Sequence, residues 1–395
     1  MERFVRVQVP SLAPKKSVPI WILAFLTKKT FLIFGNIMYI FFIVIIIIAL
    51  IGVKAKNPFS SELYTDNFSL KKSNALKGIF VLIILISHAT HSDGMYNFDA
   101  SLFDKLYTVV DKNVIGQSSV VSFFFFSGYG IMYSIEKKGK EYVKSMPTKR
   151  CLKLAVHFGL FCAIFLAVCY IISAIKKLRF TDVFDITWFI SATWYIFAIL
   201  VLYLITYFAF KLLSKHTHSV LTVLIVTVAA IVIAYFILYE YWYDTIIIYS
   251  LGLLFKLYES RIFSFLQKKN RYIFALCISL VIQASVTFLY YMHFRLFILL
   301  EIKHISFLIT LLLITYKVTF DNVILQFSGK HLFSIYVLQR IPMLVMDNIG
   351  FKQYPYLYVI ITVVVTVVLC VLFDYCTGKL DKILFTRDRI NKENV

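Results

Sequence analysis

Acidic residues, glycine and proline are all scarce in this 395-residue chain. Asp and Glu number 21 against 41 Lys and Arg, and charged residues make up only 16% of the sequence. A soluble globular domain carries about 25% charged residues, so this shortage excludes both a soluble enzyme built on one core and a disordered chain. With 13 glycines and 7 prolines, collagen-like and low-complexity sequence are excluded as well.

The cysteines form no metal or redox motif. None of the six stands in a Cys-x-x-Cys pair, and all lie in or beside apolar runs: Cys151, Cys162, Cys169, Cys277, Cys370 and Cys376. Such residues are expected to pack as small apolar side chains rather than to form disulfides. No spacing matches a zinc site, a P-loop or a dinucleotide-binding turn, so no metal ligand is predicted.

Apolar residues dominate instead. Hydrophobic residues make up 60% of the chain, and the mean hydropathy is +0.81. A helix needs about 20 apolar residues to cross a bilayer core. The segments that meet this need are 31–53, 76–92, 114–135, 151–175, 189–213, 219–239, 243–258, 271–292, 304–318, 329–349 and 355–376. The sequence therefore predicts an all-α fold, a polytopic membrane helical bundle with a ten-helix core and one extra N-terminal helix.

The basic residues indicate how the bundle is oriented. If the segment that ends at His91 runs from the inside to the outside, nearly two thirds of the 41 Lys and Arg residues lie on the inner side. Cytoplasmic loops of membrane proteins carry such an excess. The pattern predicts a multi-pass protein with a cytoplasmic C-terminus, and it explains the net charge of +20 without nucleic-acid binding. The abundance of Ile, Phe, Tyr and Lys favours a bacterial plasma membrane.

The N-terminal region departs from that pattern. The run 31–53 is long for the apolar part of a signal peptide and lacks a small-x-small cleavage site, so a retained helix is predicted. A full span would put the basic tail 1–29 outside, against the charge rule, and the alternative is a helix that lies at the interface. We predict three parts: 1–72 with the tail, the extra helix and a cytoplasmic linker; 73–380 as the transmembrane domain; and 381–395 as a cytoplasmic basic tail.

One predicted helix carries ionisable residues in an otherwise aliphatic run. Lys77 and His88 are eleven positions apart, which at about 100° per residue places both on one helix face, roughly 16 Å apart along the axis. His91 follows on the same stripe. Ionisable groups in a membrane usually line a cavity, and imidazole transfers protons near neutral pH. The structural alternative is that Lys77 extends to the interface and His88 bonds to a neighbouring helix.

Further motifs follow Lys77-x10-His88 in a defined order. A Phe-rich run ends in Ser127-Gly128, and a basic cluster then opens the next predicted helix. The later motifs are two Trp-aromatic pairs, a Gly-containing segment and a Gly-Lys stretch with a Ser and a Tyr: 188–189, 194–195, 250–254 and 327–338. Together they resemble the acyltransferase-3 family of multi-spanning membrane acyltransferases, over about residues 73–380.

The resemblance implies an O-acyltransferase. Such enzymes move an acyl group, usually acetyl, from cytoplasmic acetyl-CoA to a hydroxyl of a cell-surface polysaccharide or a lipid-linked sugar. A sugar hydroxyl needs a base when it attacks, and His88 is the candidate, with Lys77 and His91 as further candidate catalytic residues. The candidates for binding the phosphates of coenzyme A are the residues of the basic cluster, Lys149, Arg150 and Lys153.

Other polar residues are candidates for a substrate or a structural role. Ser127 and Gly128 allow close approach of a backbone, either of a neighbouring helix or of a substrate. Tyr336 and Arg340 stand one helical turn apart inside a predicted span, so they are candidates to share a cavity face or to bond between helices.

Two positions depart from the family pattern. Lys77 stands where the family has Arg, which removes the planar fork that grips a carboxylate or a phosphate. Gln339 stands where a His often follows the Tyr-Leu pair, so no role is assigned to a second histidine there.

Two other functions fit a polytopic membrane protein. A transporter or flippase of lipid-linked sugars predicts paired broken helices in repeated halves, and no internal repeat is evident. A polysaccharide polymerase usually carries a large basic outer loop, whereas the predicted outer loop 92–113 has four Asp and two Lys. The sequence leaves open the acceptor sugar, the acyl chain length, an acyl-histidine intermediate and the oligomeric state.

Overall fold

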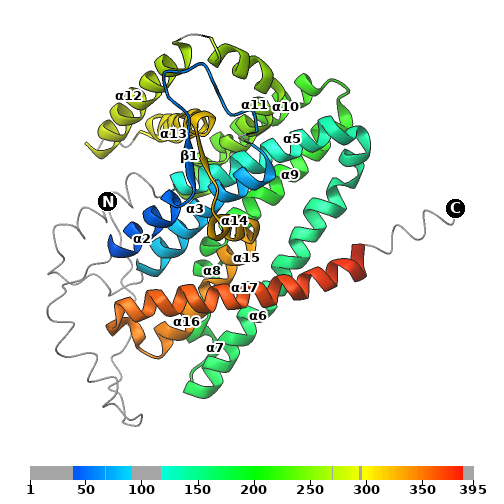
Figure 1. The fold of residues 1–395 in the computed structure, drawn as a ribbon. Helices are drawn as coiled ribbons and strands as arrows, with labels where there is room; N and C mark the ends of the chain where they lie inside the picture. The colour runs from blue at the N-terminus through cyan, green and yellow to red at the C-terminus, as the bar shows by residue number, and fades with distance from the viewer. Residues whose placement is uncertain (1–38, 67, 91–116, 269, 293–295, 386–395) are drawn as a thin grey trace.

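The computed structural model describes residues 39–66, 68–90, 117–268, 270–292 and 296–385. In these residues the chain is almost entirely helical, with one sheet of two short strands (Figure 1). Seven helices of the described part are long and apolar enough to cross a membrane, with Ser118–Lys176 taken as one continuous segment. The predicted all-α membrane bundle is therefore confirmed.

The longer helices account for the predicted spans, and short helices lie between them. The helices are α2 (Tyr39–Leu50), α3 (Leu70–Thr90), α5 (Ser118–Met146), α6 (Lys153–Lys176), α7 (Phe180–Val183), α8 (Ile186–Ala192), α9 (Trp194–Leu212), α10 (His216–Ile237), α11 (Ile247–Leu266), α12 (Arg271–Tyr291), α13 (Phe297–Lys317), α14 (Val323–Lys330), α15 (Leu332–Leu338), α16 (Arg340–Asn348) and α17 (Pro355–Phe385). A π-helical turn covers Pro147–Leu152, and 3-10 turns cover Glu240–Trp242 and Phe351–Gln353. The strands are β1 (Val53–Ala55) and β2 (Val318–Phe320).

Helix α3 is the central element of the bundle. It contacts α2, α5, α14, α15 and α17, which surround it in Figure 1. Of its most apolar window, 67% is buried inside the protein, the highest value among the seven spans of the described residues. Since Lys77 lies in the first half of α3 and His88 near its end, we call the two ends of this helix the Lys77 end and the His88 end.

Two glycines allow α14 to touch α3 backbone to backbone. A Cβ atom at Gly78 would lie 2.0 Å from the carbonyl oxygen of Leu325, and one at Gly329 would lie 1.8 Å from that of Asn74. Real side chains do not tolerate such distances, so both positions require glycine. This close crossing brings the residue after Gly329, Lys330, to the Lys77 end of α3.

The junction of α5 and α6 is a π-helical turn that begins at Pro147. Proline has no N–H to continue the hydrogen-bond ladder of α5, and its ring clashes with the preceding turn. The chain accommodates it with six residues of wider helix and then continues into α6. Turns of this kind are often found at functional sites, and this one carries Lys149 and Arg150.

The prediction of one continuous helix over 329–349 is wrong. The structure has the end of α14, then α15, then α16, with breaks at His331 and Gln339. Pro342 explains the second break, because it cannot donate a hydrogen bond to the carbonyl of Leu338 and is tolerated only in the first turn of a helix. The break places Arg340 at the start of α16, beside a cavity.

Other predicted segments also have different bounds in the structure. The segment 189–213 is divided at Thr193 into α8 and α9, and 243–258 is shifted toward the C-terminus as α11. The predicted N-terminal helix 31–53 ends earlier, at Leu50, where a turn leads into β1. Its first part, with the tail before it, lies outside the described residues, so the choice between a full span and an interfacial helix stays open.

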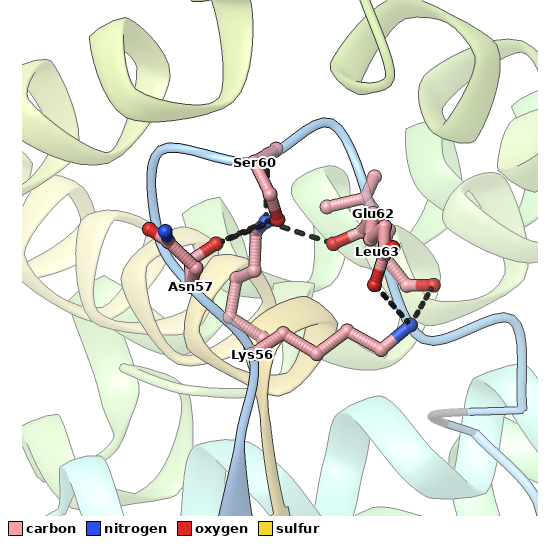
Figure 2. A network of polar contacts seen from close by, with 6 residues as sticks. Lys56, Asn57, Ser60, Glu62 and Leu63 are labelled. Carbon is pink, nitrogen blue, oxygen red and sulfur yellow. Dashed lines mark hydrogen bonds and ion pairs between the residues drawn. The ribbon is translucent and has the colours of Figure 1, made fainter.

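The chain between α2 and α3 is fixed to the end of α13. β1 pairs antiparallel with β2, with Val53 opposite Phe320. The ammonium group of Lys317, which is only 3% exposed, donates to three backbone carbonyls at 2.8 Å each, those of Asn57, Ser60 and Glu62 (Figure 2). Lys56 donates to the carbonyl of Leu63 in the same network. These bonds define the shape of residues 56–64, which we call the 56–64 loop.

Candidate active site

His88 lies beside a cavity of about 370 Å³ near the end of α3, which we call the His88 cavity. α3, α5, α8, α9, α15 and α16 all contribute to its wall, and its polar lining residues include Ser191, Tyr241, Tyr336 and Arg340. Tyr336 donates to the carbonyl of Ala192 at 3.3 Å, and the hydroxyls of Ser191 and Tyr241 are 2.7 Å apart. The cavity therefore combines apolar side chains such as Ile83 and Ile84 with several hydrogen-bonding groups.

The side chain of Arg340 contacts His88 directly. Its Nη2 lies 3.2 Å from Nε2 of the imidazole. Because guanidinium has only donors, Nε2 must accept this bond, and the imidazole is then neutral with its proton on Nδ1. A neutral imidazole is the protonation state that a general base requires. Arg340 therefore fixes the orientation of the ring and places a positive charge beside it.

The same two residues border a second cavity of about 450 Å³, which we call the Trp188 cavity. The guanidinium carbon of Arg340 lies 5.6 Å from the centre of the Trp188 ring, within range of a cation–π contact. Thus His88 and Arg340 line two cavities.

The predicted basic cluster lies in a third cavity, at the Lys77 end. This basic cavity, of about 350 Å³, is lined by Lys149, Arg150, Lys153 and His157 together with residues that come from distant parts of the chain: Lys330, His331 and Asp374. Two carboxylates hold some of these groups. Asp374 accepts from His331 and Ser334, and Asp381 accepts from Lys153 and His157. The remaining cations give the cavity an excess of positive charge, as an anionic ligand requires.

Lys77 lines a fourth cavity, the largest of these at about 640 Å³. Arg150 lines both this Lys77 cavity and the basic cavity, so the two adjoin at the same end of α3. Lys256 lies in the Lys77 cavity as well, where it bonds to Glu259 at 2.7 Å. Lys77 and His88 therefore share one helix, as predicted, but they open into cavities at opposite ends of it.

The wall of the Lys77 cavity includes the end of the chain that leads into α3. Asp66 and residues 68–70 belong to it, and they directly follow the 56–64 loop. Lys72 donates to Asp66 at 2.5 Å, and this hydrogen bond holds the pKa of the Asp66 carboxyl below its usual range. The loop that Lys317 fixes therefore supports one wall of this cavity.

Ser127 lies between the two ends of the site. Its side chain interacts with the hydroxyls of Tyr195 and Tyr203. Tyr203 lines the basic cavity, and Tyr195 follows Trp194, which lines the His88 cavity. A row of hydroxyl groups therefore extends along α9 from the basic cavity toward His88.

Gly128 lies at a close contact between two helices. A Cβ atom there would lie 2.0 Å from the carbonyl oxygen of Tyr249, and one at Gly252 would lie 2.4 Å from that of Phe125. The two glycines let α5 and α11 approach closely, so Gly128 contributes helix packing, which is one of the two roles predicted for it. His91, the remaining predicted site residue, lies outside the described residues.

Lys330 and Asp374 line the basic cavity but were not among the predicted site residues. Asp374 carried a usable signal, because a single carboxylate inside an apolar run is costly unless it has partners. His331, Cys370 and Asp374 also form a group that could hold a metal ion, with ligand atoms within 4.8 Å of one another. The hydrogen bonds of Asp374 to His331 and Ser334 account for this grouping without a metal, and the absence of a metal site stays a prediction.

Comparison with known proteins identifies a family. A family model described as an acyltransferase domain, Acyl_transf_3, matches residues 70–375. That range covers most of the chain and includes His88, Arg340 and the basic cluster. No curated protein and no solved structure matches significantly. The fold and the match define a membrane acyltransferase, and the chain belongs to the acyltransferase-3 family.

Proposed function

We propose that the protein transfers an acetyl group from acetyl-CoA to a hydroxyl of a cell-surface polysaccharide or a lipid-linked sugar, in a bacterial plasma membrane. The observation that carries this proposal is the pair of sites at the two ends of α3. A basic cavity fits an anionic donor at one end, and a histidine fits a general base at the other. In this proposal the Lys77 end and the C-terminus face the cytoplasm.

The basic cavity binds the phosphates of the donor. Arg150 can offer paired N–H donors, whereas Lys149 and Lys330 act as point charges. Lys153 and His157 are already held by Asp381, so they contribute less free positive charge. Arg150 extends the positive region to the Lys77 cavity, where Lys77 adds a further cation near the point at which the donor enters.

The reactive end of the donor then reaches toward His88. Lys77 and His88 are eleven positions apart, which corresponds to about 16 Å along a helix. The flexible pantetheine arm is the part of coenzyme A that spans such a distance. The hydroxyls of Ser127, Tyr203 and Tyr195 follow the same direction and suit the amide groups of that arm.

At the His88 end, the residues supply a base and a positive charge. The acceptor hydroxyl oxygen attacks the carbonyl carbon of the thioester while His88 takes the hydroxyl proton. The carbon–sulfur bond then breaks, and the thiolate of coenzyme A leaves with that proton. After it has left Nε2, the positive charge of Arg340 stabilises the negative charge that develops on the carbonyl oxygen, which lowers the barrier to attack. Arg340 must move away from Nε2 before this nitrogen receives the proton.

In the test, membranes that contain the protein are supplied with acetyl-CoA labelled in the acetyl group, and the release of coenzyme A is measured. We expect label to enter the glycan fraction in wild type and His88→Ala to lose this transfer. His218→Ala is the matched control, because His218 is exposed at the start of α10, away from every cavity described above. A wild-type protein that moves lipid-linked sugar but never consumes acetyl-CoA would be a transporter, and the proposal would be wrong.

A further inference from the structure

The Trp188 cavity is the second cavity that the His88–Arg340 pair lines. His88 and Arg340 line both cavities, and the other lining residues of each are different. The wall of the Trp188 cavity comes from α6, α7, α8, α16 and the first turn of α17. The row of hydroxyls from the basic cavity ends at Tyr195, next to Trp194 in the wall of the His88 cavity, so we assign the Trp188 cavity to the second substrate.

The lining of this cavity suits a neutral sugar. Trp188 is 43% exposed, so part of its indole stays accessible beside its contacts with Arg340 and Phe165, and the C–H face of a pyranose ring can pack against that part. Around it stand the hydrogen-bonding side chains of Asp185, Asp347, Asn348 and Lys352. A cavity of about 450 Å³ that combines one aromatic platform with a few polar groups has the size and the character of a small-ligand site.

Asp185 has an oxygen available for a ligand. Its Oδ1 accepts from the backbone N–H groups of Thr187 at 2.8 Å and Trp188 at 3.2 Å, which caps α8. Both capping bonds go to the same oxygen, so within the described part of the chain Oδ2 is left to accept from a sugar hydroxyl. The cap also ties the position of this carboxylate to that of the Trp188 ring.

The charge of the cavity argues against the donor as its occupant. Two carboxylates, Asp185 and Asp347, accompany two cations, Lys352 and Arg340, and Lys352 lies 3.5 Å from Asp347. A lining with balanced charges suits a neutral molecule. The phosphates of coenzyme A are better placed in the basic cavity at the other end of α3.

We propose that the Trp188 cavity is the acceptor site, where Trp188 stacks on the sugar ring and Asp185 fixes one of its hydroxyls, so that these two residues determine acceptor specificity. This inference rests on the proposed acetyl transfer. The bound sugar presents one hydroxyl to His88. Its oxygen bonds to the acetyl carbon, the carbon–sulfur bond breaks, and the proton passes through His88 to the coenzyme A thiolate.

The test compares the KM for the acceptor with the KM for the donor. The acceptor probe is the unacetylated glycan purified from cells that carry the His88→Ala chain, and the donor is acetyl-CoA. We expect Trp188→Ala and Asp185→Asn each to raise the KM for the glycan on the order of tenfold, with the KM for acetyl-CoA unchanged. Asparagine still caps a helix, so Asp185→Asn tests the carboxylate rather than the fold.

Two further variants separate binding from folding. Trp188→Phe keeps an aromatic surface and should recover most of the affinity for the glycan, whereas a merely structural role would not show this selective recovery in KM. Tyr170→Ala removes an aromatic side chain that is 67% exposed on α6, outside every cavity described above, and should change neither KM. If both KM values rise together in Trp188→Ala, or the glycan KM stays the same, the acceptor assignment is wrong.

The outcomes also distinguish this inference from the function on which it rests. If acetyl transfer is lost in His88→Ala but the KM for the glycan is unchanged in Trp188→Ala, only the acceptor site is overturned. A wild-type protein that transfers no acetyl group overturns both.

Discussion

The guanidinium of Arg340 lies 3.2 Å from the imidazole of His88, although 252 positions separate the two residues in the chain. This contact depends on the break between α15 and α16, because Arg340 is the first residue of α16. It gives the candidate base a defined tautomer and a neighbouring positive charge. Four predictions follow from this site and from the packing that supports it.

Replacing Arg340 should impair the chemical step. Arg340→Met removes the group that orients His88 and the charge beside the reacting carbonyl, so kcat should fall on the order of 10²-fold. The KM for acetyl-CoA should change little, since the donor phosphates bind at the other end of α3. Steady-state kinetics in membranes measures both values. Arg261→Gln, an exposed change on α11, is the control. An Arg340→Met protein with normal kcat would remove Arg340 from the account.

Replacing Arg150 should weaken donor binding. Arg150→Gln removes a charge from both the basic cavity and the Lys77 cavity, so the KM for acetyl-CoA should rise about tenfold. Because phosphate contacts are screened by salt, the wild-type KM should also rise with ionic strength, and the variant should show a weaker rise. Lys138→Gln removes the same charge from an exposed position of α5 and should leave the KM unchanged. Equal effects of the two substitutions would mean that the cavity does not bind the donor.

The α3–α14 crossing should not tolerate a methyl group. Gly329→Ala would place a carbon atom 1.8 Å from the carbonyl of Asn74, so the helices must separate at a cost of about 1–3 kcal/mol or more. The midpoint of thermal unfolding in detergent should fall clearly. Gly159→Ala on α6 is the control, because nothing lies within 4 Å of a Cβ at that position, and alanine favours a helix. A Gly329→Ala protein as stable as wild type would refute the close crossing.

The buried Lys317 should stabilise the 56–64 loop. Lys317→Met removes the shared donor of three loop carbonyls, so the loop loses the hydrogen bonds that fix its shape. Amide hydrogen exchange across 56–66 should become faster, with little change in α9 or α10. Lys54→Met is the control, since the Lys54 side chain is 70% exposed. Unchanged exchange in the loop would show that the Lys317 bonds do not hold it.

Local chemistry predicted the helices well and their interruptions less well. Long apolar runs leave few alternatives to membrane helices, so each of the ten predicted core segments contains helix in its described part. A run such as 329–349 hides its breaks, because averaged hydropathy ignores the missing N–H of Pro342. The close backbone contacts at Gly78 and Gly329 depend on which helices are neighbours, and this cannot be derived from a single sequence.

In the candidate site, too, some groupings could be predicted from the sequence and others could not. Lys149, Arg150 and Lys153 are adjacent in the chain, so their grouping was visible in the sequence. Asp374 and Lys330 join them only through the packing of α14, α15 and α17 against α3 and α6. For the same reason, the position of Arg340 over Trp188 and beside His88 required the folded structure.

The most direct test of the whole account is a structure of the protein in a membrane mimetic with coenzyme A bound. The account predicts the phosphates between Lys149, Arg150 and Lys330, the pantetheine arm along Ser127 and Tyr195, and the sulfur atom in the His88 cavity. Coenzyme A with its phosphates elsewhere, or with its sulfur remote from His88, would contradict the two-ended site around α3.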